Sequence, residues 1–145
     1  MEEKWMQEAL KEAKKAYEKL EIPVGAVIVK EGKIIARAHN LKETKQTAIA
    51  HAEIMAIQKA NKKLENWRLN DCEMYVTLQP CDMCMGAIVS SRIKKLYIGT
   101  LDPKRTEPIN IEKFKQEFGL DITVGIKQNE CEYILKEFFK ELRKI

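Results

Sequence analysis

Two short motifs contain the residue types that bind zinc and move protons. The first is His51-Ala52-Glu53, and the second is Pro80-Cys81-Asp82-Met83-Cys84. Imidazole and thiolate are ligands that zinc favours, and three protein ligands leave a tetrahedral zinc ion one open position for water. Because zinc lowers the pKa of such a water from about 15.7 toward about 7, hydroxide becomes available at neutral pH. Together the two motifs predict a hydrolytic zinc site.

The spacing within each motif gives a role to each side chain. Cys81 and Cys84 are three residues apart near the predicted start of a helix, so both sulfurs face the same way and the helix dipole favours their thiolates. His51 supplies the third ligand. Glu53, two residues further on, can take a proton from the water and pass it to a ring nitrogen and then to the leaving amine. We expect one Zn²⁺ per chain on His51, Cys81 and Cys84, with Glu53 as the catalytic residue.

Three other interpretations fit parts of this pattern. A structural zinc site would need a fourth protein ligand, and the candidates His39, Cys72 and Cys131 form no second closely spaced pair with the two cysteines. A thioredoxin-like dithiol would leave the His-Ala-Glu motif without a role. A binding domain without activity would use all these residues structurally. His-x-Glu followed by Pro-Cys-x-x-Cys is the signature of zinc deaminases that act on nucleobases, and the sequence favours that class.

The elements that position these motifs follow from hydrophobic periodicity and turn residues. Helices are predicted over 3–20, from 48–51 to 64, from about 81, over 111–118 and over 130–144. Strands are predicted over 24–29, 33–39, 74–78, 96–99 and 122–124, with loops over 41–47 and 101–110. Leu20 in the first helix and Leu142 in the last are expected to face inward. This order predicts one α/β domain, residues 1–145, with three layers in which helices cover both faces of a five-stranded sheet.

Composition indicates a soluble globular protein. Of the 145 residues, 45% are hydrophobic and 33% are charged, and the formal net charge is +4. This mildly basic balance permits an anionic partner such as RNA without requiring one. The charged N-terminus has no apolar signal segment, and no run approaches the roughly 18 apolar residues of a membrane span. We therefore expect a cytoplasmic protein with no membrane partner.

Longer stretches of the sequence are similar to one known family. The stretches that carry the similarity are Ile22–Val27, Asn66–Leu69, Met74–Leu78, Gly86–Ile88, Ser91–Ile93, Glu130-Cys131 and Phe138-Phe139. Over nearly its whole length the chain resembles the bacterial tRNA-specific adenosine deaminases of the cytidine deaminase superfamily. These enzymes convert the wobble adenosine of an arginine tRNA to inosine.

The resemblance implies a cytidine-deaminase-like fold with a mixed sheet, a homodimer, and the same zinc ligands and proton carrier. It also implies a set of substrate-binding residues around the metal, namely Asn40, Ala52, Pro80, Asp102 and Lys104. Asn40 would hydrogen-bond the target nucleoside. Asp102 and Lys104 fall where the family's loop after the fourth strand meets the RNA. If RNA is the substrate, we expect Lys104 and Arg105 to contact phosphates near the target nucleotide.

The chain departs from the family's usual pattern at three places near the expected substrate. Thr47–Ala50 replaces a run that usually reads Asp-Pro-Thr or Asp-Ala-Thr, Gln79 replaces a Glu, and Pro103–Pro108 replaces Ala-Lys-Thr-Gly. None of these changes touches the metal chemistry. We therefore expect a zinc-dependent hydrolase that converts adenosine to inosine at the wobble position of tRNA, with a free nucleobase or nucleoside, such as guanine or cytosine, as the alternative substrate.

Overall fold

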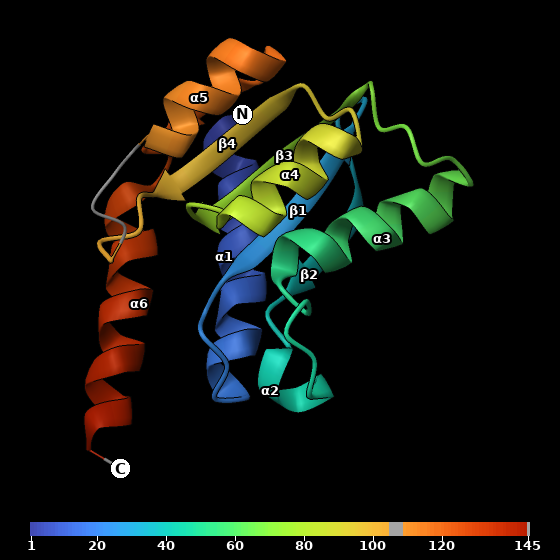
Figure 1. Cartoon of the computed structure of the whole chain (residues 1–145). Coiled ribbons are helices and arrows are strands. Elements are labelled where there is room, and N and C mark those ends of the chain that lie inside the picture. Colours follow the sequence, from blue (N-terminus) through green and yellow to red (C-terminus); the bar gives the residue numbers. More distant parts are fainter. Residues whose placement is uncertain (105–108, 145) are drawn as a thin grey trace.

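The computed structural model describes residues 1–104 and 109–144, and in them a sheet lies between two layers of helices (Figure 1). The strands are β1 (Gly25–Lys30), β2 (Lys33–His39), β3 (Cys72–Leu78), β4 (Lys95–Thr100) and β5 (Asp121–Val124). The helices are α1 (Glu2–Glu18), α2 (Lys42–Lys45), α3 (Ala52–Leu64), α4 (Asp82–Ser90), α5 (Ile109–Phe118) and α6 (Gln128–Arg143).

The sheet has five strands in the order β2-β1-β3-β4-β5. Strand β1 is antiparallel to both β2 and β3, with Ile28 opposite Met74. Strands β3, β4 and β5 run parallel, with Val76 opposite Ile98. A parallel pair needs a crossover connection, and α4 makes the one between β3 and β4. The mixed five-stranded α/β fold expected from the sequence is confirmed.

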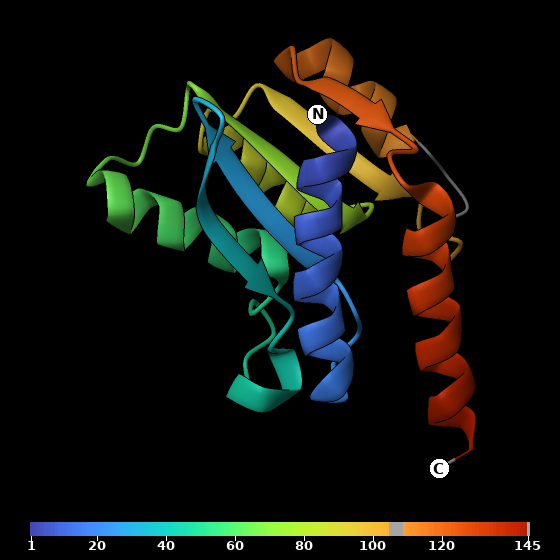
Figure 2. The ribbon, with the colours of Figure 1, turned by 180° about the vertical axis from the view of Figure 1, so that it is seen from behind.

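Alternating side chains along the central strands divide the core between the two faces of the sheet. Ile28, Met74 and Val76 pack with α3, α4 and α5 on one face. Val27 and Tyr75 pack with α1 and α6 on the other face. Figures 1 and 2 show these two groups of helices from opposite sides of the sheet. The central strands are therefore buried on both faces, which gives the ends of β3 and β4 a rigid base.

Three details differ from the sequence-based expectation. Helix α2 forms within the segment expected to be a loop, and none of its residues is buried, so it has no apolar periodicity to reveal it. Leu142 is 45% exposed because the last turns of α6 extend beyond the sheet (Figure 1). Leu20 is 63% exposed because α1 ends at Glu18. Arg105, expected to contact phosphate, lies outside the described residues.

The connections at one end of the sheet bring the two motifs together. The chain leaves β3 at Leu78 and enters α4 at Asp82, so the Pro-Cys motif follows the C-terminal end of a central strand. The His-Ala-Glu motif begins α3, which packs beside α4 (Figure 1). Within residues 1–104 and 109–144, no helix has the length and apolar character needed to cross a membrane.

Candidate active site

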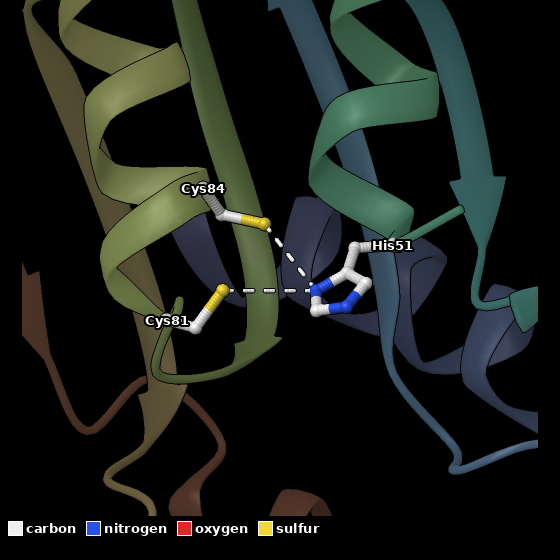
Figure 3. A group of neighbouring side chains, drawn as sticks. All are labelled: His51, Cys81 and Cys84. Carbon is white, nitrogen blue, oxygen red and sulfur yellow. Dashed lines mark hydrogen bonds between the residues drawn. The ribbon is translucent and has the colours of Figure 1, made fainter. Parts of the chain in front are cut away.

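The starts of α3 and α4 present the three residues of a metal-binding group. His51 directly precedes α3 in an extended conformation, and Cys81 directly precedes α4 in the same way. Cys84 lies in the first turn of α4. Figure 3 shows the two sulfur atoms pointing from α4 toward the imidazole. Cys81 thus lies one position before α4, close to the helix start that the sequence predicts. The spacing of three residues between Cys81 and Cys84 still directs both sulfur atoms the same way.

The donor atoms are spaced as a zinc ion requires. Nδ1 of His51 lies 3.7 Å from Sγ of Cys81 and 3.5 Å from Sγ of Cys84 (Figure 3). Zinc–sulfur bonds of about 2.3 Å and zinc–nitrogen bonds of about 2.05 Å, at a tetrahedral angle, place nitrogen and sulfur about 3.6 Å apart. In the described part of the chain, no other His, Cys or carboxylate cluster could hold a metal ion. The residues present therefore fit zinc in both donor chemistry and spacing.

Hydrogen bonding within this group favours a thiolate at the start of α4. Hydrogen bonds with Cys84 and His51 lower the pKa of the Cys81 thiol to about 3. The same bond with Cys81, together with burial, raises the pKa of Cys84. The bond with Cys81 also raises the pKa of the His51 imidazole. A thiolate is the form of cysteine that binds metal, and the lowered pKa of Cys81 favours that form.

Glu53 lies beside the metal-binding group in the first turn of α3. Its side chain is buried, and this burial raises the pKa of its carboxyl group to about 7. The Cys84 thiol is within hydrogen-bonding reach of it. A carboxyl group with a pKa near neutral both accepts and donates protons at neutral pH, which is what general acid–base catalysis requires.

Asn40 joins the end of β2 to the start of α3. Its Oδ1 accepts a hydrogen bond of 2.8 Å from the backbone N–H of Ala52, which is buried. The backbone N–H of Asn40 donates to the carbonyl oxygen of Val24 at 3.2 Å. Asn40 and Ala52 therefore both lie next to His51, and the amide of Asn40 helps to fix where α3 begins.

Gln79 connects the Pro-Cys motif to the loop after β4. Its Oε1 accepts a 3.0 Å hydrogen bond from the backbone N–H of Asp102, and its own N–H donates to Thr100 at 2.9 Å. Pro80, which follows it, is buried. In the sequence Gln79 stands out only as a departure from the family pattern, and no local motif links it to a partner 23 positions away. The structure thus gives Gln79 a role that its position in the sequence does not reveal.

Asp102 and Lys104 form a turn that faces α6. Oδ1 of Asp102 accepts a 2.9 Å hydrogen bond from the backbone N–H of Lys104. The Lys104 ammonium lies 4.7 Å from the centre of the Phe139 ring, a cation–π contact. This turn and α6 border a pocket of about 870 Å³ whose lining includes Leu78 and Arg143. The lining does not include the three residues of the metal-binding group, and Leu78 lies three positions before Cys81 along the chain.

The whole chain is similar to known deaminases. The model of the family described as MafB19-like deaminase matches residues 1–143. The tRNA-specific adenosine deaminase of Bacillus subtilis is 48% identical over 149 aligned positions, which cover 99% of this chain and 91% of that protein.

Solved structures of deaminases are similar in fold as well. A structure from a study of adenosine-to-inosine editing by tRNA wobble deaminases has a TM-score of 0.84 at 39% identity, with 90% of this chain and 98% of that chain covered. The guanine deaminase of Bacillus subtilis has a TM-score of 0.67 at 36% identity, with 82% and 70% covered. Both chains share the fold of this protein, and the first matches it more completely.

Proposed function

Because this chain belongs to the MafB19-like deaminases, and among them to the family of tRNA-specific adenosine deaminases, we propose that it is a zinc-dependent hydrolase that converts adenosine to inosine at the wobble position of tRNA. One observation carries the proposal. His51, Cys81 and Cys84 converge on one point, and the buried carboxyl of Glu53 lies beside them. This arrangement suits water activation next to a proton carrier.

The reaction replaces an amino group by oxygen from water. His51, Cys81 and Cys84 would hold one Zn²⁺, which when bound lowers the pKa of a water molecule toward about 7 and so supplies the nucleophile. Glu53 accepts the proton of the attacking water on a carboxylate oxygen and donates it to the ring nitrogen beside the reacting carbon. The same carboxyl then moves a second proton to the amino group, which leaves as ammonia. One water is consumed for each ammonia released.

Substrate would bind around the metal-binding group and along the neighbouring pocket. Asn40, Ala52 and Pro80 border the group on the α3 and α4 sides. Asp102 and Lys104 line that pocket. The lining combines apolar side chains with the basic groups of Lys104, Lys136 and Arg143, a combination that suits unstacked bases and their phosphates in RNA loops. The pocket therefore supports a tRNA anticodon loop as the substrate.

The domain organisation, the oligomeric state and the cellular location of the protein are proposed from its membership of this family. We propose that residues 1–145 act as one domain, that two copies pair as a homodimer, and that the enzyme works in the cytoplasm on tRNA. Similarity to the tRNA deaminase family supports all three. A light-scattering mass at micromolar concentration tests the pairing, and the mass of a single chain would contradict it.

A second candidate function is deamination of a free base. The similarity to the guanine deaminase of Bacillus subtilis favours it, because that enzyme shares 36% identity with this chain. The tRNA-specific relative shares 48% identity and covers 99% of the chain, against 82% for the guanine deaminase. We therefore rank the tRNA substrate first.

A side-by-side assay of ammonia release separates these two substrates. Zinc-loaded protein is given an anticodon stem-loop with adenosine at the wobble position and, separately, free adenosine, guanine and cytosine. The proposal predicts rapid ammonia release from the stem-loop and little from the free compounds. Rapid turnover of guanine with an inert stem-loop would replace it with the second candidate.

A further inference from the structure

The segment 40–51 carries two site residues, and only its ends have apolar support, from Leu41 and Ala50. It runs from the end of β2 to the start of α3, with Asn40 near one end and His51 at the other. Its middle forms α2, which buries none of its residues. Figures 1 and 2 both show α2 beside the end of α1. Because α2 has no buried side chains of its own, its position depends on polar contacts.

Glu21 makes polar contacts of this kind from a different part of the chain. Its carboxylate accepts hydrogen bonds from the backbone N–H of Glu43 at 3.1 Å, from the backbone N–H of Thr44 at 2.6 Å and from the Thr44 hydroxyl at 2.7 Å. Glu21 is 2% exposed. The N–H groups in the first turn of a helix have no partner inside it, and the dipole there favours a negative charge. Glu21 therefore caps α2 across a gap of more than 20 residues.

The same short stretch of chain also holds the start of the segment. The carbonyl oxygen of Val24, three residues after Glu21, accepts the hydrogen bond from the N–H of Asn40. Within the segment, the N–H of Leu41 donates to the carbonyl oxygen of Ala50 at 3.0 Å and closes the loop. Backbone hydrogen bonds thus hold the two ends of segment 40–51, and the carboxylate of Glu21 holds its middle, α2, through hydrogen bonds from a side chain.

The hydrogen bonds of Glu21 to α2 also fix the position of a positively charged residue in the segment that joins Asn40 to His51. Lys42, the first residue of α2, is exposed and lies two positions after Asn40 in the segment that ends at His51. An exposed lysine held in this segment suits a phosphate of a bound RNA. If the hydrogen bonds between Glu21 and α2 were lost, Lys42 would lose its defined position. His51 would still be held by α3 and, once zinc is bound, by the metal.

We propose that Glu21 is a positioning residue: by capping α2 it holds the rim of the active site in the form that receives the substrate. The inference rests on the proposed function, because it assigns the rim to RNA binding. It predicts an effect on substrate affinity rather than on the chemical step, since the hydrogen bonds of Glu21 within the described residues go to Glu43 and Thr44, outside the metal-binding group.

The test compares Glu21→Gln with Glu18→Gln, an exposed glutamate at the end of α1 that serves as the control. The amide of Gln keeps one acceptor but turns an N–H toward the donors of Thr44. Hydrogen exchange of the zinc-loaded proteins, without substrate, should be at least about tenfold faster at Glu43 and Thr44 in Glu21→Gln and unchanged in the control. KM for the anticodon stem-loop should rise about threefold to tenfold with kcat within about twofold. Thr44→Val removes only the hydroxyl contact and should shift both quantities less, in the same direction.

Two results would overturn the inference. One is unchanged exchange at Glu43 and Thr44 in Glu21→Gln, which would mean that the carboxylate does not hold α2. The other is faster exchange with unchanged KM, or with a loss confined to kcat. If Glu21→Gln does not fold, Thr44→Val decides the question by the same two measurements. A wild-type protein that never deaminates the stem-loop would overturn the proposed function, whereas the exchange experiment would still report on the cap.

Discussion

Glu53 is the side chain on which the proposed chemistry depends. It is buried at the start of α3, close enough to the metal-binding group to exchange protons there. Glu53→Gln preserves its shape and removes its ability to carry a proton. We expect kcat to fall by about 10²–10⁴-fold or more while zinc content and fold are retained. Ammonia release and zinc analysis on the same preparation measure both.

The control for this change is Glu117→Gln on the exposed side of α5, which should keep normal turnover. Near-normal kcat in Glu53→Gln would contradict the assigned role. Loss of zinc together with activity would instead indicate that Glu53 supports the metal site.

The cysteines separate an open metal site from a closed structural one. Purified protein should contain about one zinc per chain, because three donors converge at one place. Cys81→Ser should remove most of this zinc. Cys72→Ser should not, because Cys72 is buried at the start of β3, away from the group. Equal loss of zinc from both variants, measured by metal analysis, would point to a fourth protein ligand and a structural site.

Local spacing explains which site residues could be found in the sequence. The three metal-binding residues and Glu53 lie in two short motifs whose spacing has direct chemical meaning, and the structure brings all four together. The contacts of Gln79 with Asp102 and of Glu21 with α2 join residues more than 20 positions apart. Such pairs have no local signature, so they become visible only once the chain is folded.

At the scale of elements, α1 and β2 are joined by a buried carboxylate. Glu12 of α1 is 2% exposed, and its carboxylate lies 3.0 Å from Nδ1 of His39 and 2.8 Å from Nζ of Lys15. Arg37 of β2 adds a contact at 3.4 Å. The amide of Gln keeps one acceptor but removes the negative charge that these partly exposed donors share, so Glu12→Gln should lower the free energy of unfolding by about 1–2 kcal/mol at pH 7. Chemical denaturation measures this, and Glu3→Gln on the exposed face of α1 is the control.

The same carboxylate makes this stability depend on pH. Burial raises the pKa of Glu12, but its hydrogen bonds to Lys15 and His39 outweigh burial, so the folded pKa lies below the ordinary value of 4.5. A lowered folded pKa gives stability that is fully present above about 4.5 and is lost as the pH falls through the folded pKa. The difference in unfolding free energy between wild type and Glu12→Gln should therefore shrink below pH 4.5. A difference that stays constant down to pH 3 would contradict this assignment.

The strands and the longer helices could be predicted from the sequence, whereas the short helix α2 could not. Short apolar runs marked the central strands, which are buried on both faces, and helical periodicity marked α1, α3 and α6, which bury one side against the core. Helix α2 depends on a carboxylate of another segment rather than on apolar side chains, so no period marks it. The inward placement of Leu142 was wrong because periodicity does not reveal how far a helix runs past its sheet.

At the scale of the whole molecule, the loop after β4 and α6 border the pocket that we propose receives the RNA. Lys104 lines this pocket, over the ring of Phe139. If its ammonium contacts a phosphate, Lys104→Ala should reduce the slope of log affinity against log salt by about 0.7 and raise KM for the stem-loop. Binding titrations at two or more salt concentrations measure the slope. An unchanged slope, or an equal effect on a free base, would place Lys104 outside the RNA interface.

The most direct test of the central claim is to map inosine in an anticodon stem-loop after incubation with zinc-loaded protein. Wild type should convert the wobble adenosine, and no other adenosine, to inosine, and Glu53→Gln with its zinc retained should leave it unchanged. This result would tie the metal-binding group, the proton carrier and the RNA substrate to one reaction. An unmodified wobble adenosine in the presence of fully zinc-loaded wild type, while free guanine is deaminated, would contradict the account.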